Sequence, residues 1–179
     1  MEKIESVLID EHQLKERVEA IGTELTDYYK DSMPIVVCVL KGSLLFFADL
    51  VRAMKIPLEV ACIRASSYGS GTQSSGKVTV SEATPIHAEG RRVLLVEDIV
   101  DSGNTIKCIR QWFEKRGASD IHIVSLLDKP ERREVDVVVD YVGFEIPDAF
   151  VVGYGLDYDQ RYRNLPYIGI LDTSAITQN

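Results

Sequence analysis

Cysteine is scarce in this chain, and its few occurrences are not arranged as metal ligands. Only three are present among 179 residues, Cys38, Cys62 and Cys108, and no CxxC or other metal-binding spacing joins them. Each stands among apolar residues, which is typical of a small buried side chain, with a reactive thiol as the lesser alternative. The sequence therefore gives no support for a disulfide scaffold or a cysteine-based metal site.

Basic residues and long apolar runs are also in short supply. The chain has 20 Lys and Arg residues and 28 Asp and Glu residues, which gives a net charge of −8. This negative charge weighs against non-specific nucleic-acid binding. No apolar run approaches the roughly 18 residues of a membrane span. Residues 1–10 lack the basic start and apolar stretch of a signal peptide. We therefore expect no nucleic-acid partner, no membrane partner and a cytoplasmic location.

Two familiar phosphate-binding motifs are missing as well. The sequence contains neither the GxxxxGK[ST] loop of many nucleotide hydrolases nor the GxGxxG turn of dinucleotide-binding domains. It also contains no internal repeat and no linker between domains. At 179 residues the chain is long enough for one substantial core, so we predict a single domain over 1–179.

The hydrophobic pattern predicts strands alternating with helices. A helix is expected after Asp10, with Gln13 completing a capping box, and a second helix is expected after Ser43 as its cap. The first helix should bury residues spaced by three and four: Leu14, Val18, Ile21, Leu25 and Tyr28. Apolar runs predict strands at 35–40, about 58–65, 92–96 and 121–127, and shorter strands at 135–142, 150–154 and 167–171.

Uniformly apolar strands of this kind indicate an α/β fold with a mostly parallel central sheet covered by helices on both faces. The core is expected over about 30–128. A small irregular hood is expected mainly over 129–179, with a contribution from the N-terminus. Residues 66–77 are rich in Gly and Ser without an apolar pattern, so we interpret them as a loop that acts as a lid, the alternative being an idle flexible loop.

The residues that carry chemistry follow the strand at 92–96. Ser102, Gly103 and Thr105 stand just before a helix, where amides, hydroxyls and the helix dipole favour a phosphate. Glu97, Asp98 and Asp101 precede them. Carboxylates beside a phosphate repel it unless they face hydroxyls or a divalent cation. The alternative is that these acidic residues serve only to cap the N-terminus of the following helix.

This segment, VLLVEDIVDSGNT at 93–105, resembles the phosphoribosyl-pyrophosphate-binding sequence of type I phosphoribosyltransferases. Three further segments resemble the hypoxanthine-guanine branch of that family and occur in the same order: LKGS followed by FFADL (40–43, 46–50), SLLDK (125–129), and GFEIPD through VVGYGLDY (143–148, 151–158). The likeness covers nearly the whole chain. It implies the type I phosphoribosyltransferase fold, Mg²⁺ as cofactor and a homodimer or homotetramer.

The resemblance also implies a role for individual residues. Glu97 and Asp98 would meet the ribose hydroxyls and the metal shell, Asp101 would be the catalytic base near the purine, and the 5′-phosphate site would comprise Asp101, Ser102, Gly103, Asn104 and Thr105. The pyrophosphate site would comprise Lys41, Gly42 and Arg163, with a cis peptide between Leu40 and Lys41. For Lys41 and Gly42 taken alone, an ordinary turn is the alternative.

On the purine side, Lys129 would donate to the 6-oxo group, Phe150 would stack on the base and the backbone of Val151 would contact its far edge. Asp157 would be a metal ligand beside the base. Ser67 and Tyr68 would belong to the lid. On bare sequence, a solvated lysine, a core phenylalanine and surface ion pairs of Asp157 and Arg163 are the alternatives.

The implied activity is purine salvage, in which hypoxanthine or guanine reacts with phosphoribosyl pyrophosphate to give a nucleoside monophosphate and pyrophosphate. A lysine ammonium offers donors and no acceptor, so adenine should be rejected. Two alternatives stay open. One is a sister enzyme that prefers xanthine, and the other is a regulatory protein on the same fold that senses phosphoribosyl pyrophosphate.

Overall fold

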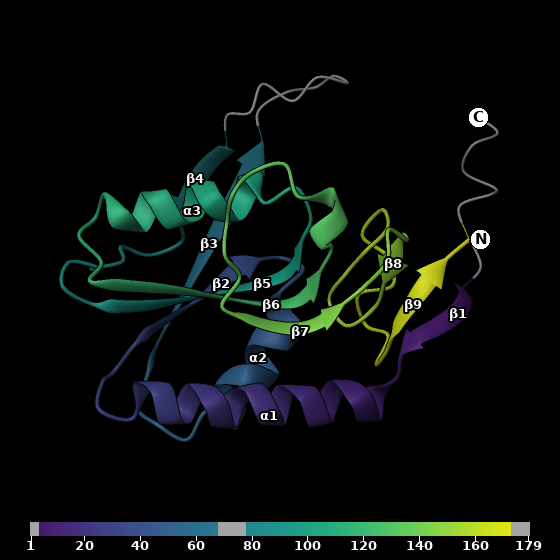
Figure 1. Ribbon diagram of the computed structural model, residues 1–179, viewed down its shortest axis with the longest axis horizontal. Helices are drawn as coiled ribbons and strands as arrows, with labels where there is room; N and C mark the ends of the chain where they lie inside the picture. The colour runs from purple at the N-terminus through teal and green to yellow at the C-terminus, as the bar shows by residue number, and fades with distance from the viewer. Residues whose placement is uncertain (1–3, 68–77, 173–179) are drawn as a thin grey trace.

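A six-stranded sheet forms the centre of the molecule (Figure 1). The structure is a computed structural model that describes residues 4–67 and 78–172. The strand order is β4-β3-β2-β5-β6-β7, and only the edge strand β4 runs antiparallel to its neighbour. The bounds are β2 (Ile35–Leu40), β3 (Glu59–Ser67), β4 (Val78–Glu82), β5 (Arg92–Val100), β6 (Asp120–Asp128) and β7 (Tyr141–Glu145). The predicted α/β class with a mostly parallel sheet is confirmed.

Helices cover both faces of this sheet, as predicted. Figure 1 shows α1 (Glu11–Tyr29) and α2 (Leu44–Ala53) on one face and α3 (Asn104–Glu114) on the other. Side chains alternate along each strand, so β2 sends Val36 and Cys38 toward α1 and α2, and Ile35 and Val37 toward the α3 side. Both faces of the central strands are therefore buried, and most of their side chains are apolar.

Helix α1 begins at the predicted capping box. The Asp10 carboxylate accepts from the Gln13 amide at 2.8 Å, and the Asp10 amide donates to the Gln13 side chain at 3.0 Å. The predicted buried face is correct except at its end, where Tyr29 is buried and Tyr28 is 40% exposed. The helical period of 3.6 residues brings position 29, four residues after Leu25, onto the core side.

A second, three-stranded antiparallel sheet lies beside the large one. It joins β1 (Ile4–Ile9), β9 (Ile168–Leu171) and β8 (Val151–Val152) in that order. The N-terminal strand thus pairs with the C-terminal part of the chain. Strand β7, which falls within 129–179, pairs with β6 in the large sheet instead, while the exact division into core and hood stays a prediction.

Three local expectations were wrong. Strand β5 continues to Val100 instead of ending at 96, because its pairing with β6 persists to Asp128. Residues 135–140 form no strand. Ser43 adopts a helical backbone, which is unsuited to an N-cap, and its hydroxyl donates to the Val39 carbonyl at 2.7 Å instead. Among the described residues no helix is long and apolar enough to cross a membrane.

The close packing of α1 on α2 depends on Gly22. A Cβ atom built at this glycine would lie 2.4 Å from the Cβ of Ala53. We therefore expect Gly22→Val to lower the free energy of unfolding by about 1–3 kcal/mol, because the added atoms would force the helices apart. Urea unfolding measures the effect. Thr23→Val, which places the same side chain at the next, exposed position of α1, is the matched control. Equal stability of the two variants would contradict this packing role.

Candidate active site

The turns that follow β2, β5 and β6 lie at one edge of the sheet. These strands are parallel neighbours, so their carboxyl ends point the same way. The turns contain nearly all the residues predicted from the central strands, and the 146–163 segment approaches them from the smaller sheet. This is the edge at which open α/β sheets bind ligands.

The turn between β5 and α3 has the features of an anion site. Gly103 has a φ of +85° and precedes the first residue of α3. Among the described residues, the amides of Gly103, Thr105 and Ile106 have no backbone acceptor outside the helix ladder. The helix dipole adds a partial positive charge at the same place. The turn thus has the backbone geometry that a phosphate site needs, and its role as a phosphate site stays a prediction.

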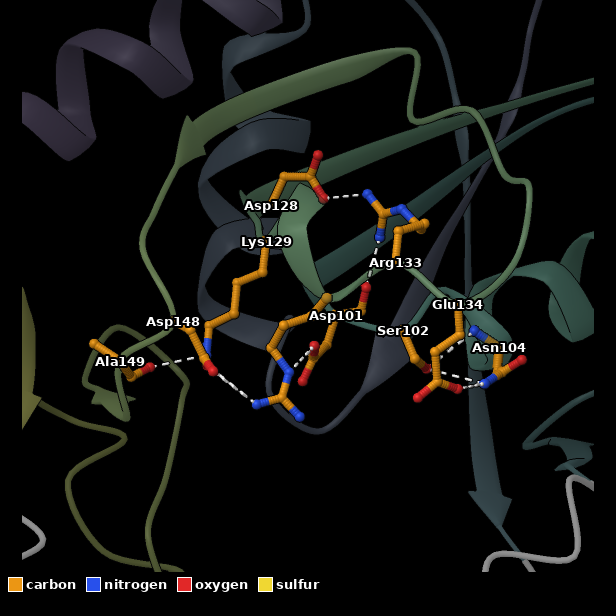
Figure 2. A network of polar contacts seen from close by, with 10 residues as sticks. Asp101, Ser102, Asn104, Asp128, Lys129, Arg133, Glu134, Asp148 and Ala149 are labelled. Carbon is orange, nitrogen blue, oxygen red and sulfur yellow. Dashed lines mark hydrogen bonds and ion pairs between the residues drawn. The ribbon is translucent and has the colours of Figure 1, made fainter.

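Ser102 and Asn104 belong to a small polar network beside this turn (Figure 2). The Asn104 side-chain amide donates to the Ser102 hydroxyl at 3.2 Å and to the Glu134 carboxylate at 2.9 Å. The Glu134 amide donates to the Ser102 carbonyl at 3.0 Å. The chain at Glu134 therefore braces the turn from the side, a contact that the sequence pattern did not indicate.

Asp101 lies among arginines that the sequence reasoning missed. Its Oδ1 atom is 2.7 Å from Nε of Arg132, as an ion pair without good hydrogen-bond alignment, and its carbonyl accepts from Arg133 at 2.8 Å. Arg133 also pairs with the buried carboxylate of Asp128. Two adjacent arginines, separated from Lys129-Pro130 only by Glu131, were a signal that could have pointed to this turn.

Lys129 is almost fully buried, which excludes the ordinary solvated lysine. Figure 2 shows its side chain reaching toward 148–149. Its Nζ donates to the Ala149 carbonyl at 2.8 Å and lies 3.4 Å from Asp148 Oδ1. Arg132 also donates to both Asp148 oxygens at 3.1 Å. Hydrogen bonds from Arg132, and then from Lys129, hold the pKa of Asp148 below its usual value. Asp148 therefore links Lys129 to the arginine that faces Asp101.

The two predicted purine contacts near Lys129 differ in exposure. The Phe150 side chain is 45% exposed and meets the Tyr158 ring edge to face, with centroids 5.6 Å apart. Val151 is buried, and its backbone pairs with Ile170 in the small sheet. Phe150 directly follows Ala149, whose carbonyl Lys129 contacts, and its exposed ring provides an apolar surface that a planar ligand could cover.

The acidic pair at the end of β5 is in close contact. The Glu97 carboxylate accepts from the Asp98 amide at 3.1 Å, and the Asp98 carboxylate accepts from the Ile99 amide at 2.8 Å. Burial, followed by the neighbouring Asp98 carboxylate, raises the pKa of Glu97 well above its usual value. Burial also raises the pKa of Asp98, against the opposing effects of its hydrogen bonds and of Arg163. The pair is therefore built to bind a proton or a positive charge.

The predicted pyrophosphate residues come together beside Asp98. The peptide between Leu40 and Lys41 is cis, as the resemblance implied. A Cβ at Gly42 would overlap the Asp98 carboxylate, and a Cβ at Gly155 would lie 2.0 Å from the Gly42 carbonyl oxygen. Only glycine fits at these two positions, so the turn after β2, the end of β5 and the 153–157 loop pack directly against one another.

Arg163 and Asp157 complete this side of the site. The Arg163 guanidinium is 2.9 Å from Asp157 Oδ1 and donates to the Gly155 carbonyl at 2.8 Å. Lys41 is exposed, with its Nζ 3.5 Å from the Gln160 side chain. Asp157 and Arg163 thus pair with each other beside the Lys41–Gly42 turn, while their predicted roles as metal ligand and pyrophosphate contact stay predictions.

The predicted metal ligands fit a Mg²⁺ ion whose coordination is shared between protein carboxylates and oxygens of water or substrate. Within residues 4–67 and 78–172, no three His, Cys, Asp or Glu side chains gather as a ready-made cation site. Mg²⁺ in proteins commonly uses one or two carboxylates with waters and substrate phosphates. Asp98 and Asp157, both close to Arg163, suit that arrangement better than a site made by protein alone. The lid residue Tyr68 lies outside the described residues, and Ser67 ends β3.

Comparisons with known proteins show the family to which the chain belongs. Residues 7–159 match the family model of the phosphoribosyl transferase domain. The hypoxanthine-guanine phosphoribosyltransferase of Bacillus subtilis is 51% identical over 94% of this chain and 93% of its own length. The hypoxanthine phosphoribosyltransferase of Salmonella typhimurium is 48% identical over 91% of this chain and 93% of its own. A crystal structure of the Staphylococcus aureus hypoxanthine phosphoribosyltransferase has a TM-score of 0.92 at 39% identity, over 98% of this chain and 95% of that one.

The raised pKa of Glu97 makes the stability of the ligand-free protein depend on pH. The folded protein binds this proton more tightly than the unfolded chain, so stability falls as the pH rises from about 4.5 to the raised folded value, and stays lower above it. Glu97→Gln removes the ionisable group, and with it the loss of stability at high pH. We expect the variant to be more stable than the wild type near pH 8, because the wild type there carries the buried charge that the variant lacks. Near pH 4 it should have no advantage.

Urea unfolding of both proteins at the two pH values measures this difference. Glu145→Gln, at an exposed position in β7, is the control for loss of one carboxylate. A Glu97→Gln variant that is no more stable than the wild type at the higher pH would rule out an unfavourable buried charge.

Proposed function

Because this chain belongs to the phosphoribosyltransferase family, we propose that it is a purine salvage enzyme: it transfers the 5-phosphoribosyl group of phosphoribosyl pyrophosphate to hypoxanthine or guanine. The products are IMP or GMP and pyrophosphate. The observation that carries the proposal is the juxtaposition of a helix-start anion turn at 101–105 with the buried Lys129 and the Gly42–Asp98–Gly155 contact. In this proposal these three features bind the 5′-phosphate, the purine base and the pyrophosphate, respectively.

The 5′-phosphate occupies the turn from Asp101 to Thr105 in this proposal. The amides of Gly103, Thr105 and Ile106 are available as donors, and the hydroxyls of Ser102 and Thr105 can add to them. The positive φ of Gly103 fits the tight turn before α3. Glu97 and Asp98, at the end of the preceding strand, would accept hydrogen bonds from the ribose hydroxyls.

The purine lies between Lys129 and Phe150. Lys129 already donates to a carbonyl, that of Ala149, and an oxo group at position six of a purine is chemically the same kind of acceptor. Phe150 would stack on the ring, and the backbone near Val151 would contact its far edge. An amino group at position six would leave the buried ammonium facing hydrogens, so adenine is disfavoured.

Asp101 acts as the base in the proposed reaction. A purine ring nitrogen attacks C1 of the ribose, the bond from C1 to the pyrophosphate oxygen breaks, and the proton lost from the purine is accepted by the Asp101 carboxylate. In the ligand-free protein this carboxylate faces Arg132 at 2.7 Å. Arg132 is half exposed, so it can turn away from Asp101 when a substrate arrives.

The pyrophosphate leaves between the Lys41–Gly42 turn and Arg163. Backbone amides of that turn and the Arg163 guanidinium would bind its oxygens, with Lys41 adding a positive charge. Mg²⁺, held by Asp98 and Asp157 with Glu97 behind them, would offset the negative charge that builds on the diphosphate. Closure of the lid that includes Ser67 and Tyr68 would exclude water from the reacting centre.

We further propose that the chain assembles as a homodimer or homotetramer and works in the cytoplasm. Large apolar side chains are exposed on α2 and β3, among them Leu44 and Val60, which suits a surface covered by another copy. Sedimentation equilibrium of the purified chain distinguishes a monomer from these assemblies.

The proposed activity is tested by pyrophosphate release with four bases, in the presence and absence of Mg²⁺. We expect turnover with hypoxanthine and guanine, little with adenine because of Lys129, and loss of activity when Mg²⁺ is removed. Preference for xanthine would favour the sister-enzyme alternative. No release with any base, together with binding of phosphoribosyl pyrophosphate and of an mRNA leader, would favour the regulatory alternative and refute the proposal.

Asp101→Asn tests the role of the base separately. The amide keeps the size of the side chain but cannot accept the proton, so turnover should fall by roughly 10²–10⁴ while substrate binding is largely kept. Steady-state rates with hypoxanthine, and calorimetric binding of phosphoribosyl pyrophosphate, measure the two effects. Asp136→Asn, an exposed aspartate in the irregular 135–140 segment, is the control. Wild-type turnover in Asp101→Asn would refute the role.

A further inference from the structure

The 153–155 loop reaches the pyrophosphate side of the site in an unusual backbone conformation. Gly153, Tyr154 and Gly155 have φ values of +102°, +48° and +104°. The two glycines can adopt such values freely, whereas a tyrosine does so only when its surroundings hold it there. The loop therefore has little intrinsic preference for its observed shape, and contacts from elsewhere must fix it.

The loop contacts the pyrophosphate side on its Gly155 face. A Cβ at Gly155 would lie 2.0 Å from the Gly42 carbonyl oxygen, so the two backbones are in direct contact. The Gly155 carbonyl accepts from Arg163 at 2.8 Å, and the same guanidinium meets Asp157 at 2.9 Å. A shift of this loop would move Arg163 and Asp157 relative to the Lys41–Gly42 turn.

On its other side the loop is held by the Tyr154 hydroxyl. This hydroxyl donates to Asp49 Oδ2 on α2 at 2.5 Å, and burial, followed by Asp49, raises the pKa of Tyr154, which keeps it protonated. The Tyr154 side chain also borders a cavity of about 640 Å³ between α1 and α2. The ring packs against the core on its buried side, and the hydrogen bond fixes the direction of its hydroxyl.

Asp49 is well placed for this role because α2 begins at the other half of the site. The helix starts at Leu44, directly after the Lys41–Gly42 turn, and the Leu44 amide donates to the Lys41 carbonyl at 3.1 Å. Asp49 itself is oriented by an ion pair with Arg52 on the same helix. One short helix thus determines the place of both the Lys41–Gly42 turn and, through Asp49, the 153–155 loop.

We propose that Tyr154 and Asp49 are positioning residues for the pyrophosphate half of the site: their hydrogen bond sets how closely the 153–157 loop approaches the Lys41–Gly42 turn. The inference rests on the proposed function. Neither side chain touches substrate in it. They act by fixing Gly155, Arg163 and Asp157, so they affect the diphosphate and not the purine.

Tyr154→Phe removes only the hydroxyl and leaves the ring. Loss of one hydrogen bond should raise KM for phosphoribosyl pyrophosphate by about three- to tenfold, with KM for hypoxanthine unchanged within twofold and kcat less affected. Tyr28→Phe is the matched control, because the Tyr28 hydroxyl also donates to an aspartate, Asp120, at the start of β6 and away from the site. That variant should change stability without changing either KM.

Asp49 variants complete the test. Asp49→Ala should raise KM for phosphoribosyl pyrophosphate as Tyr154→Phe does, and the double variant should show no further rise, since both changes remove the same contact. Asp49→Asn keeps an acceptor oxygen and should restore much of the lost affinity. Circular dichroism confirms that each variant is folded.

Two outcomes would overturn the inference: an unchanged KM for phosphoribosyl pyrophosphate in folded Tyr154→Phe, or equal rises for both substrates. Effects of the two single changes that simply multiply in the double variant would also overturn it. A wild-type chain inactive with every base would refute the proposed function instead, so the two failures are distinguishable.

Discussion

The parallel pairing of β2, β5 and β6 is the constraint on which the site depends. These strands are buried on both faces, so their side chains must be apolar along most of their length, as in Ile35–Leu40. Charged groups lie toward the strand ends, and Glu97 and Asp98 fall within the last four residues of β5. Parallel register then brings all those ends to the same edge, and three turns that are distant in sequence become neighbours. The clustering of polar residues is a consequence of the sheet and needs no separate cause.

The charges at this edge are largely balanced within the protein. Asp101 faces Arg132, Asp128 faces Arg133, and Asp157 faces Arg163. Each arginine is thus kept in place by an acid until an anion competes for it, and each acid is protected from unpaired burial. In the proposed reaction, binding of phosphate groups would exchange these internal partners for substrate oxygens. Glu97 differs, because its raised pKa reflects a buried carboxyl that has another carboxyl as its neighbour.

Much of this arrangement could be predicted from sequence because it depends on local pattern. The capping box at Asp10 and the apolar strands are encoded within a few residues, and they were confirmed. The contacts of Arg132 and Arg133 could not be predicted, because their partners at 101, 128 and 148 are brought near only by strand pairing. Likewise, β1 pairs with β9 across almost the whole chain, and its own pattern of exposure shows little of that. The roles assigned to the site residues stay predictions.

The connection through α2 shows why such long-range contacts matter for function. The Lys41–Gly42 turn is fixed by the strand before it and the helix after it, but the 153–157 loop belongs to a different sheet. The two sheets are joined by a shared apolar core and by the contact of Lys129 with Ala149, neither of which fixes the approach of this loop to the Lys41–Gly42 turn directly. Gly42 and Gly155 are in direct contact, but two glycine backbones in van der Waals contact gain little energy. This contact therefore does little to hold the loop in place. The hydrogen bond from Tyr154 to Asp49 adds a directed attraction between this loop and α2, so a residue outside the site would affect how well the site holds its diphosphate.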